Sequence, residues 1–179
     1  MSTGFSNTEF YKELESVLPT SLGDQRKIWV ASIIEKNIDI RDLASLLNGE
    51  YKVASRFLWL LSEIGLARPD KLFAALPFLL DFTDNMNPVY KTSFANFWLI
   101  AGIPPENEGK AIDMSFQWLL SNETNVTIKS RSVLVLFKLT KKYPEIKEEL
   151  KLCLEDQMDK YSNDFRKRAV KILRELERI

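Results

Sequence analysis

Four cationic side chains near the end of the chain have a spacing that could support chemistry. Lys167, Lys171, Arg174 and Arg178 follow one another at steps of four, three and four residues. On an α-helix these steps place all four on one face, where the positive charges could follow the phosphates of a nucleic acid. Two earlier cations complete this candidate basic face: Arg131 and Lys138.

The charge of the whole chain weakens the nucleic-acid interpretation. The 179 residues contain 25 Lys and Arg against 25 Asp and Glu, so the formal net charge is zero. Residues 1–128 nevertheless carry 11 basic and 16 acidic side chains, and residues 129–179 carry 14 and 9. This asymmetry suggests an anionic partner at the C-terminal end, or a solvated face rich in Lys and Glu.

A second candidate surface is aromatic. The runs 57–61 (Phe-Leu-Trp-Leu-Leu) and 97–101 (Phe-Trp-Leu-Ile-Ala) are apolar on all sides if they are helical. Such helices are covered on every side in a folded protein. The aromatic residues therefore either fill the core or line a groove for a partner helix, a peptide or a second copy of the chain. The candidate groove residues are Trp59, Phe94, Phe97 and Trp98.

Catalytic chemistry has little support. The chain has no histidine, one cysteine and no glycine-rich phosphate loop, which disfavours an enzyme, a zinc site and a bound cofactor. Cys153 stands between leucines and is expected in the core. The carboxylate pairs Asp81/Asp84 and Glu106/Glu108 are expected to cap helices or to be solvated in turns. We expect no catalytic or metal-binding residue.

The pattern of apolar residues predicts an all-helical chain. We expect a helix over 8–18, which Pro19 stops, a helix over 24–37, and then a regular series of helix pairs. In this series one helix starts at Asn87-Pro88 and ends at Gly102, and the apolar stripe of the last helix ends at Ile179. Gly65 and Gly102 are expected to end helices as C-terminal glycines, and Pro77 should bend its helix or split its last turn. Asp39, Ser162 and either Asn125 or Thr124 are expected N-caps.

The sequence also repeats. The stretches 52–61, 90–99, 127–136 and 164–173 align at steps of 37 or 38 residues, so that Leu61, Leu99, Leu136 and Leu173 coincide. Arg56, Arg131 and Arg168 also coincide, and Phe94 takes their place in the second stretch. A repeat of this length is typical of stacked helix pairs that bury their apolar faces against neighbours.

On these features the chain resembles the HEAT-like repeat family. The resemblance covers residues 39–179 and implies a right-handed α-α superhelix, here a solenoid of about five antiparallel helix pairs. Residues 5–37 would form a divergent N-terminal capping pair, and 1–179 one domain. The resemblance also implies that Arg56, Arg131 and Arg168 form ion-pair ladders between adjacent repeats.

Two helical enzyme groups bear on function. The chain lacks the Gly-Ser-Ser-x-Met-Pro loop of the fumarase and aspartase superfamily, which includes adenylosuccinate lyase. It is similar in architecture to the DNA alkylation-repair glycosylases, which would use the basic face together with Trp98 or Trp118.

We therefore expect a non-catalytic scaffold for protein–protein interaction, with an unknown protein or peptide partner and self-association as a variant. Nucleic-acid binding through residues 129–178 is the alternative. With no export signal and no apolar run near the ~20 residues of a membrane span, we expect a cytoplasmic protein.

Overall fold

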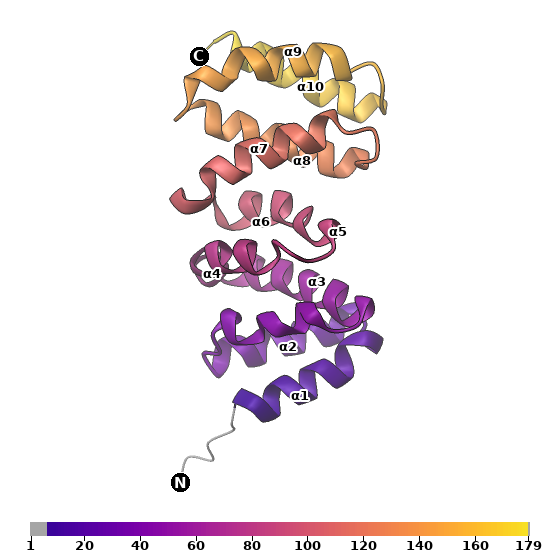
Figure 1. Ribbon diagram of the computed structural model, residues 1–179, viewed down its shortest axis with the longest axis vertical. Coiled ribbons are helices and arrows are strands. Elements are labelled where there is room, and N and C mark those ends of the chain that lie inside the picture. Colours follow the sequence, from indigo (N-terminus) through magenta and orange to yellow (C-terminus); the bar gives the residue numbers. More distant parts are fainter. Residues whose placement is uncertain (1–6, 179) are drawn as a thin grey trace. The chain divides into compact units, whose positions relative to one another are not determined.

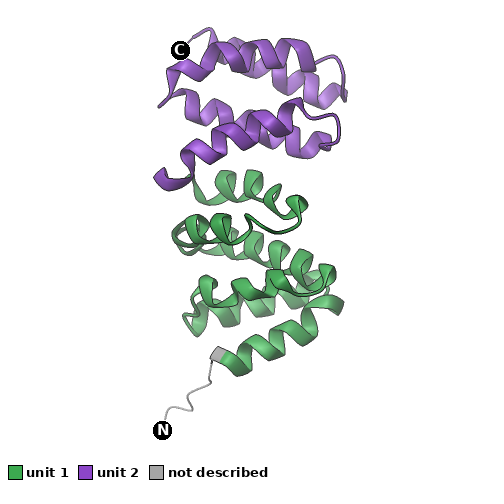
Figure 2. Ribbon diagram, in the orientation of Figure 1, with its two compact units in different colours: residues 1–104 green, residues 105–179 purple. Residues whose placement is uncertain are grey.

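The computed structural model describes residues 7–178 and is built of helices and the short turns that join them (Figure 1). It contains ten α-helices and four short 3-10 helices, with no strand among the described residues. The all-α prediction is confirmed. None of the described helices combines the length and the apolar character needed to cross a membrane. Contacts divide the chain into two compact units, residues 1–104 and 105–179 (Figure 2), which are described separately below.

Unit 1 is organised around α3. The unit contains α1 (Asn7–Val17), η1 (Leu18–Thr20), α2 (Gly23–Glu35), η2 (Ile40–Asn48), α3 (Tyr51–Ala67), α4 (Pro69–Phe82), α5 (Pro88–Lys91) and α6 (Phe94–Ala101). Helix α3 packs against α2, η2, α4 and α6. Being surrounded in this way, it buries Phe57, Leu61 and Ile64 almost completely. The Asp39 carboxylate accepts a hydrogen bond from the Arg41 amide, as expected for an N-cap, but the segment that it caps is a 3-10 helix.

The two glycines expected to end helices behave differently. Gly102 follows α6 with φ of 99°, a left-handed conformation that favours glycine. Gly65 instead lies inside α3, which continues to Ala67, so the prediction for this residue was wrong. A methyl group at Gly65 would overlap the side chain of Leu72 on α4 and come within 3.1 Å of Ile100 on α6. Gly65 therefore permits close packing of three helices.

One of two proline-containing segments in unit 1 differs from expectation. Helix α4 runs through Pro77 to Phe82 without splitting. The segment from Pro88 to Ala101, expected as one helix, breaks between α5 and α6. At the break the Ser93 amide bonds to the Tyr90 carbonyl, and the Thr92 hydroxyl donates to the Val89 carbonyl at 2.7 Å. Short-range bonds of this type compete with the regular α-helical pattern.

Unit 2 consists of two helix pairs. Its elements are η3 (Pro105–Asn107), α7 (Glu108–Leu120), α8 (Val126–Thr140), η4 (Pro144–Ile146), α9 (Lys147–Gln157) and α10 (Asn163–Leu176). Helix α7 packs along α8, and α9 contacts α7, α8 and α10. The predicted N-caps Asn125 and Ser162 are confirmed: their side chains accept hydrogen bonds from the amides of Ile128 and Phe165. Ile179, expected at the end of the last apolar stripe, lies outside the described residues.

Candidate interaction surfaces

Three of the four predicted groove aromatics belong to the core. Phe94, Phe97 and Trp98 are at most 1% exposed, and the Phe94 ring lies 5.4 Å from Phe97 and 5.7 Å from Trp98 between ring centres. Helix α6 packs against both α3 and α4, which explains why a helix that is apolar on all sides is stable there. These three residues cannot line an open groove, so that part of the prediction was wrong.

Trp59 is the exception. Its side chain lies on the outer side of α3 and is 52% exposed, while Phe57 and Leu58 beside it are buried. Two guanidinium groups lie over its indole ring: that of Arg56 at 4.6 Å from the ring centre and that of Arg26, from α2, at 5.0 Å. We call these three residues the Trp59 cluster.

The arginines of the Trp59 cluster have no acidic partner in the part of the chain that the structure describes. Neither Arg26 nor Arg56 makes a hydrogen bond or ion pair through its side chain to any described residue. The Nε atom of Arg26 is also buried without a hydrogen-bond acceptor. Leu22, the residue before α2 and one turn before Arg26, is 71% exposed. Cation–π contacts leave the in-plane N–H groups of a guanidinium available to an acceptor.

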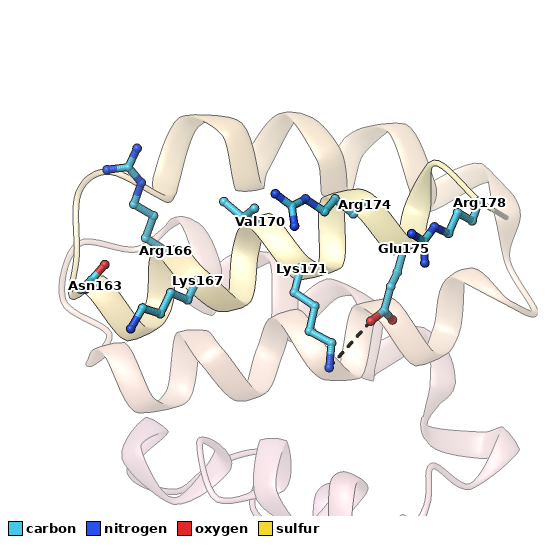
Figure 3. Close-up of a pocket in the computed structure, with 8 residues that line it drawn as sticks. All are labelled: Asn163, Arg166, Lys167, Val170, Lys171, Arg174, Glu175 and Arg178. Atoms are coloured by element: carbon cyan, nitrogen blue, oxygen red, sulfur yellow. Dashed lines mark ion pairs between the residues drawn. The ribbon is translucent and has the colours of Figure 1, made fainter.

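The predicted row of cations is present on α10. Lys167, Lys171, Arg174 and Arg178 are exposed and line a shallow pocket along the helix (Figure 3). Within the row only Lys171 has an ionic partner, Glu175 at 3.9 Å, although both side chains carry much exposed surface. The row is therefore a positively charged face with little internal neutralisation.

The two α8 cations lie apart from that pocket. Lys138 is exposed and Arg131 is half-buried, and neither lines the pocket along α10. Arg131 instead shares a second pocket with Arg168. Trp118, considered as a stacking surface for bases, is only 8% exposed. The basic residues predicted as one face thus separate: four line the pocket along α10, Arg131 lines the second pocket, and Lys138 lines neither.

The predicted arginine ladders are missing. Within residues 7–178, Arg56, Arg131 and Arg168 form no ion pair and no side-chain hydrogen bond. Arg56 lies over Trp59 instead. The expectation that these arginines tie adjacent repeats together through acidic residues was therefore wrong.

One ionic cluster, in which a buried carboxylate meets an exposed lysine, was not predicted from the sequence. Glu108, expected to cap a helix or to be solvated in a turn, is 8% exposed in the first turn of α7. Its Oε2 atom accepts hydrogen bonds from Lys142 Nζ at 2.6 Å and from the Tyr143 hydroxyl. The hydrogen bond from Lys142, supported by that from Tyr143, holds the pKa of Glu108 below its ordinary value, and the bond to Glu108 raises the pKa of Tyr143. The cluster joins the start of α7 to the turn after α8.

The burial of one lysine was also not predicted from the sequence. Lys129 is fully buried, and its Nζ donates to the carbonyl oxygens of Leu119 and Ser121, both at 2.6 Å, and of Trp118 at 3.3 Å. These carbonyls belong to the C-terminal end of α7, where a cation is favourable. One positive charge of the C-terminal region is therefore internal.

Cys153 is buried in unit 2, as predicted. Burial raises the pKa of its thiol, which keeps it protonated at neutral pH. Among residues 7–178 no group of three His, Cys, Asp or Glu side chains is arranged to hold a metal ion.

No protein-family model, curated protein or solved structure matches this chain.

Proposed function

We propose that this chain is a HEAT-like helical-repeat protein that acts without catalysis, by binding another protein through the Trp59 cluster. Its repeat character is supported by the positions of the four aligned stretches. They fall on α3, on α5 and α6, on α8 and on α10, which alternate along the chain with the other helices. Leu61 and Leu136 of the alignment are buried, and Leu99 and Leu173 are half-buried.

One observation carries the binding proposal: a half-exposed tryptophan lies beneath two arginines that have no acidic partner among the described residues. Trp and Arg are enriched among residues that dominate protein–protein affinity. A guanidinium group can bind a carboxylate through two parallel hydrogen bonds. The complementary partner is a segment with an acidic side chain for Arg26 or Arg56 next to an apolar side chain for Trp59 and Leu22.

A random peptide library displayed on phage tests this proposal directly. We expect selection on the whole chain to enrich peptides in which Asp or Glu neighbours a large apolar residue. Replacing Trp59 by Ala should then weaken a selected peptide by about 30-fold, equivalent to about 2 kcal/mol, in isothermal titration calorimetry. The double change R26Q and R56Q should weaken it to a similar degree.

The matched control is Leu66→Ala. Leu66 lies on the same helix, is 66% exposed and is outside the cluster, so its replacement should leave affinity within about twofold. Peptides without an acidic residue, or peptides that bind Trp59→Ala as tightly as the unaltered chain, would count against the proposal.

Nucleic-acid binding by the α10 row is the second candidate, supported by its four exposed cations and their single long ion pair. Fluorescence anisotropy with duplex DNA or RNA measures it. The logarithm of the association constant should fall by about 0.9 for each tenfold rise in salt concentration and each phosphate contacted. The pair K171E and R174E should abolish binding, whereas K12E and K52E, which change the net charge equally at exposed sites in unit 1, should not.

A further inference from the structure

We infer that the second pocket of unit 2 binds a phosphate monoester group, which Arg131 and Arg168 hold between α8 and α10. The pocket has a volume of about 330 Å³ and opens between the first turns of these helices. Its polar lining residues are Thr127, Ser130, Arg131, Ser162, Asp164 and Arg168. This site lies in unit 2 and does not depend on the Trp59 cluster of unit 1.

The two guanidinium groups are the main argument. Arg131 is half-buried and Arg168 is exposed, and neither makes a hydrogen bond or ion pair to a described residue. Asp164 lines the same pocket but is not within ion-pair distance of either. Two unpaired guanidinium groups facing one small volume leave up to ten N–H donors and an excess positive charge there. A bound anion accepts hydrogen bonds from these donors and neutralises the excess positive charge.

The hydroxyl groups favour phosphate over carboxylate. The side chains of Thr127 and Ser130 make no hydrogen bond to the rest of the described chain. Ser162 Oγ accepts a bond from the Phe165 amide at 3.3 Å, which leaves its O–H free to donate. Three hydroxyls and two guanidinium groups around one pocket suit an anion with more acceptor oxygens than the two of a carboxylate. A phosphate monoester presents three strong acceptor oxygens and a charge near −2 at neutral pH.

The repeat explains how the two arginines meet. Arg131 and Arg168 occupy the same position in consecutive aligned stretches, 37 residues apart, on α8 and α10. These helices pack against each other, so equivalent positions near their first turns come together. The corresponding Arg56 on α3 lies over Trp59 instead. The repeated arginine thus has a ligand-binding role in unit 2, in place of the expected ion-pair ladder.

The proposal is tested by titrating the whole chain with inorganic phosphate and following backbone amide signals by NMR. We expect saturable shifts at Thr127, Ser130 and Arg168, with a dissociation constant in the millimolar range or tighter. Replacing Arg131 or Arg168 by Gln should weaken binding by about tenfold or more, the effect of losing hydrogen bonds to a charged group. Replacing either arginine by Lys should keep part of the affinity, since Lys retains the charge but cannot form bidentate hydrogen bonds.

Arg166→Gln is the matched control, because Arg166 is an exposed arginine on the same helix that pairs with Asp159 and lies outside both this pocket and the α10 row. It should leave phosphate affinity within about twofold. Asp164→Asn should increase affinity, because it removes the one negative charge from the lining. Shifts that do not saturate, or an equal loss in Arg166→Gln and Arg168→Gln, would overturn the inference.

Two further ligands distinguish the source of the phosphate group. A peptide containing phosphoserine is compared with its unphosphorylated form and with inorganic phosphate. Tighter binding of the phosphopeptide than of inorganic phosphate identifies a modified protein as the source. Equal affinities identify a small phosphorylated molecule, and binding of the unphosphorylated peptide with equal strength contradicts a phosphate site.

Discussion

At the scale of single residues, we consider Glu108 first. Among the described acidic side chains with shifted pKa values, its contacts matter most for the stability of the fold. One carboxylate oxygen receives both the Lys142 ammonium and the Tyr143 hydroxyl, while the rest of Glu108 is covered by unit 2. An ionised carboxylate in such a position stabilises the fold because it holds two donors from a distant turn. Removing its charge leaves both donors with a weaker acceptor.

We expect Glu108→Gln to lower the free energy of unfolding by about 1–3 kcal/mol near neutral pH. Because the pKa of Glu108 is lowered in the fold, its stabilising effect is fully present above the carboxyl's ordinary pKa of 4.5. The effect disappears as the pH falls through the lowered value. Urea denaturation of both proteins between about pH 7 and pH 3 should therefore show a stability difference that shrinks below about pH 4.5.

Glu106→Gln provides the comparison, since Glu106 is an exposed acidic residue two positions earlier with no partner in the described structure. It should change stability by less than about 0.5 kcal/mol at every pH. A Glu108→Gln difference that is independent of pH would show that the carboxylate charge is not what stabilises this turn.

At the scale of helices, packing around α3 depends on a missing side chain. Gly65 lies in a helix interior, where glycine is ordinarily less favourable than alanine by about 0.5–1 kcal/mol. Leu72 and Ile100 occupy the space where its Cβ atom would lie, and Leu72 is itself completely buried. Glycine at position 65 therefore lowers the helix propensity of α3 but allows close contact with α4 and α6.

We expect Gly65→Ala to lower the free energy of unfolding by about 1 kcal/mol or more, because overpacking outweighs the gain in propensity. Gly109 on α7 offers a matched control: beyond its chain neighbours and the backbone of its own helix, nothing lies within 4 Å of the position that a Cβ atom would take. Gly109→Ala should raise stability by about 0.5–1 kcal/mol. Chemical denaturation followed by circular dichroism measures both, and stabilisation by both changes would contradict tight packing at Gly65.

At the scale of the whole molecule, unit 2 has its own core and its own polar links. Leu119, Leu136 and Leu154 are completely buried there, and the partners of Glu108 and Lys129 all lie within residues 105–179. A helical unit of this size is large enough to fold alone. The sequence predicted a single domain over residues 1–179, and the cooperativity of unfolding decides between one domain and two.

We therefore expect a fragment of residues 105–179 to be helical and to unfold cooperatively, with a free energy of about 3–5 kcal/mol. Circular dichroism during thermal and urea denaturation measures this. A shorter fragment of residues 105–143, which lacks α9 and α10, should be poorly folded because the apolar faces of α7 and α8 lose their cover. Broad, non-cooperative melting of the longer fragment would instead support a single domain.

Local signals in the sequence predicted several helix ends correctly. The caps at Asp39, Asn125 and Ser162 and the glycine at 102 depend on hydrogen bonds or backbone angles within a few residues, so the sequence contains the necessary information. The shared face of the cations on α10 likewise follows from helix geometry alone. The prediction for Gly65 failed because the role of this residue depends on side chains of other helices.

The candidate sites also divide into features that the sequence determines and features that depend on tertiary contacts. From its sequence alone, this protein is an all-helical chain with a repeated arginine and a cationic last helix. Only the tertiary structure decided that Phe94, Phe97 and Trp98 are core, that Trp59 is exposed beneath two arginines, and that Lys129 is internal. Periodicity cannot distinguish these cases, because a helix that is apolar on all sides has no preferred face until its neighbours cover it. Likewise, an arginine or lysine acquires its role from the groups that the fold brings beside it.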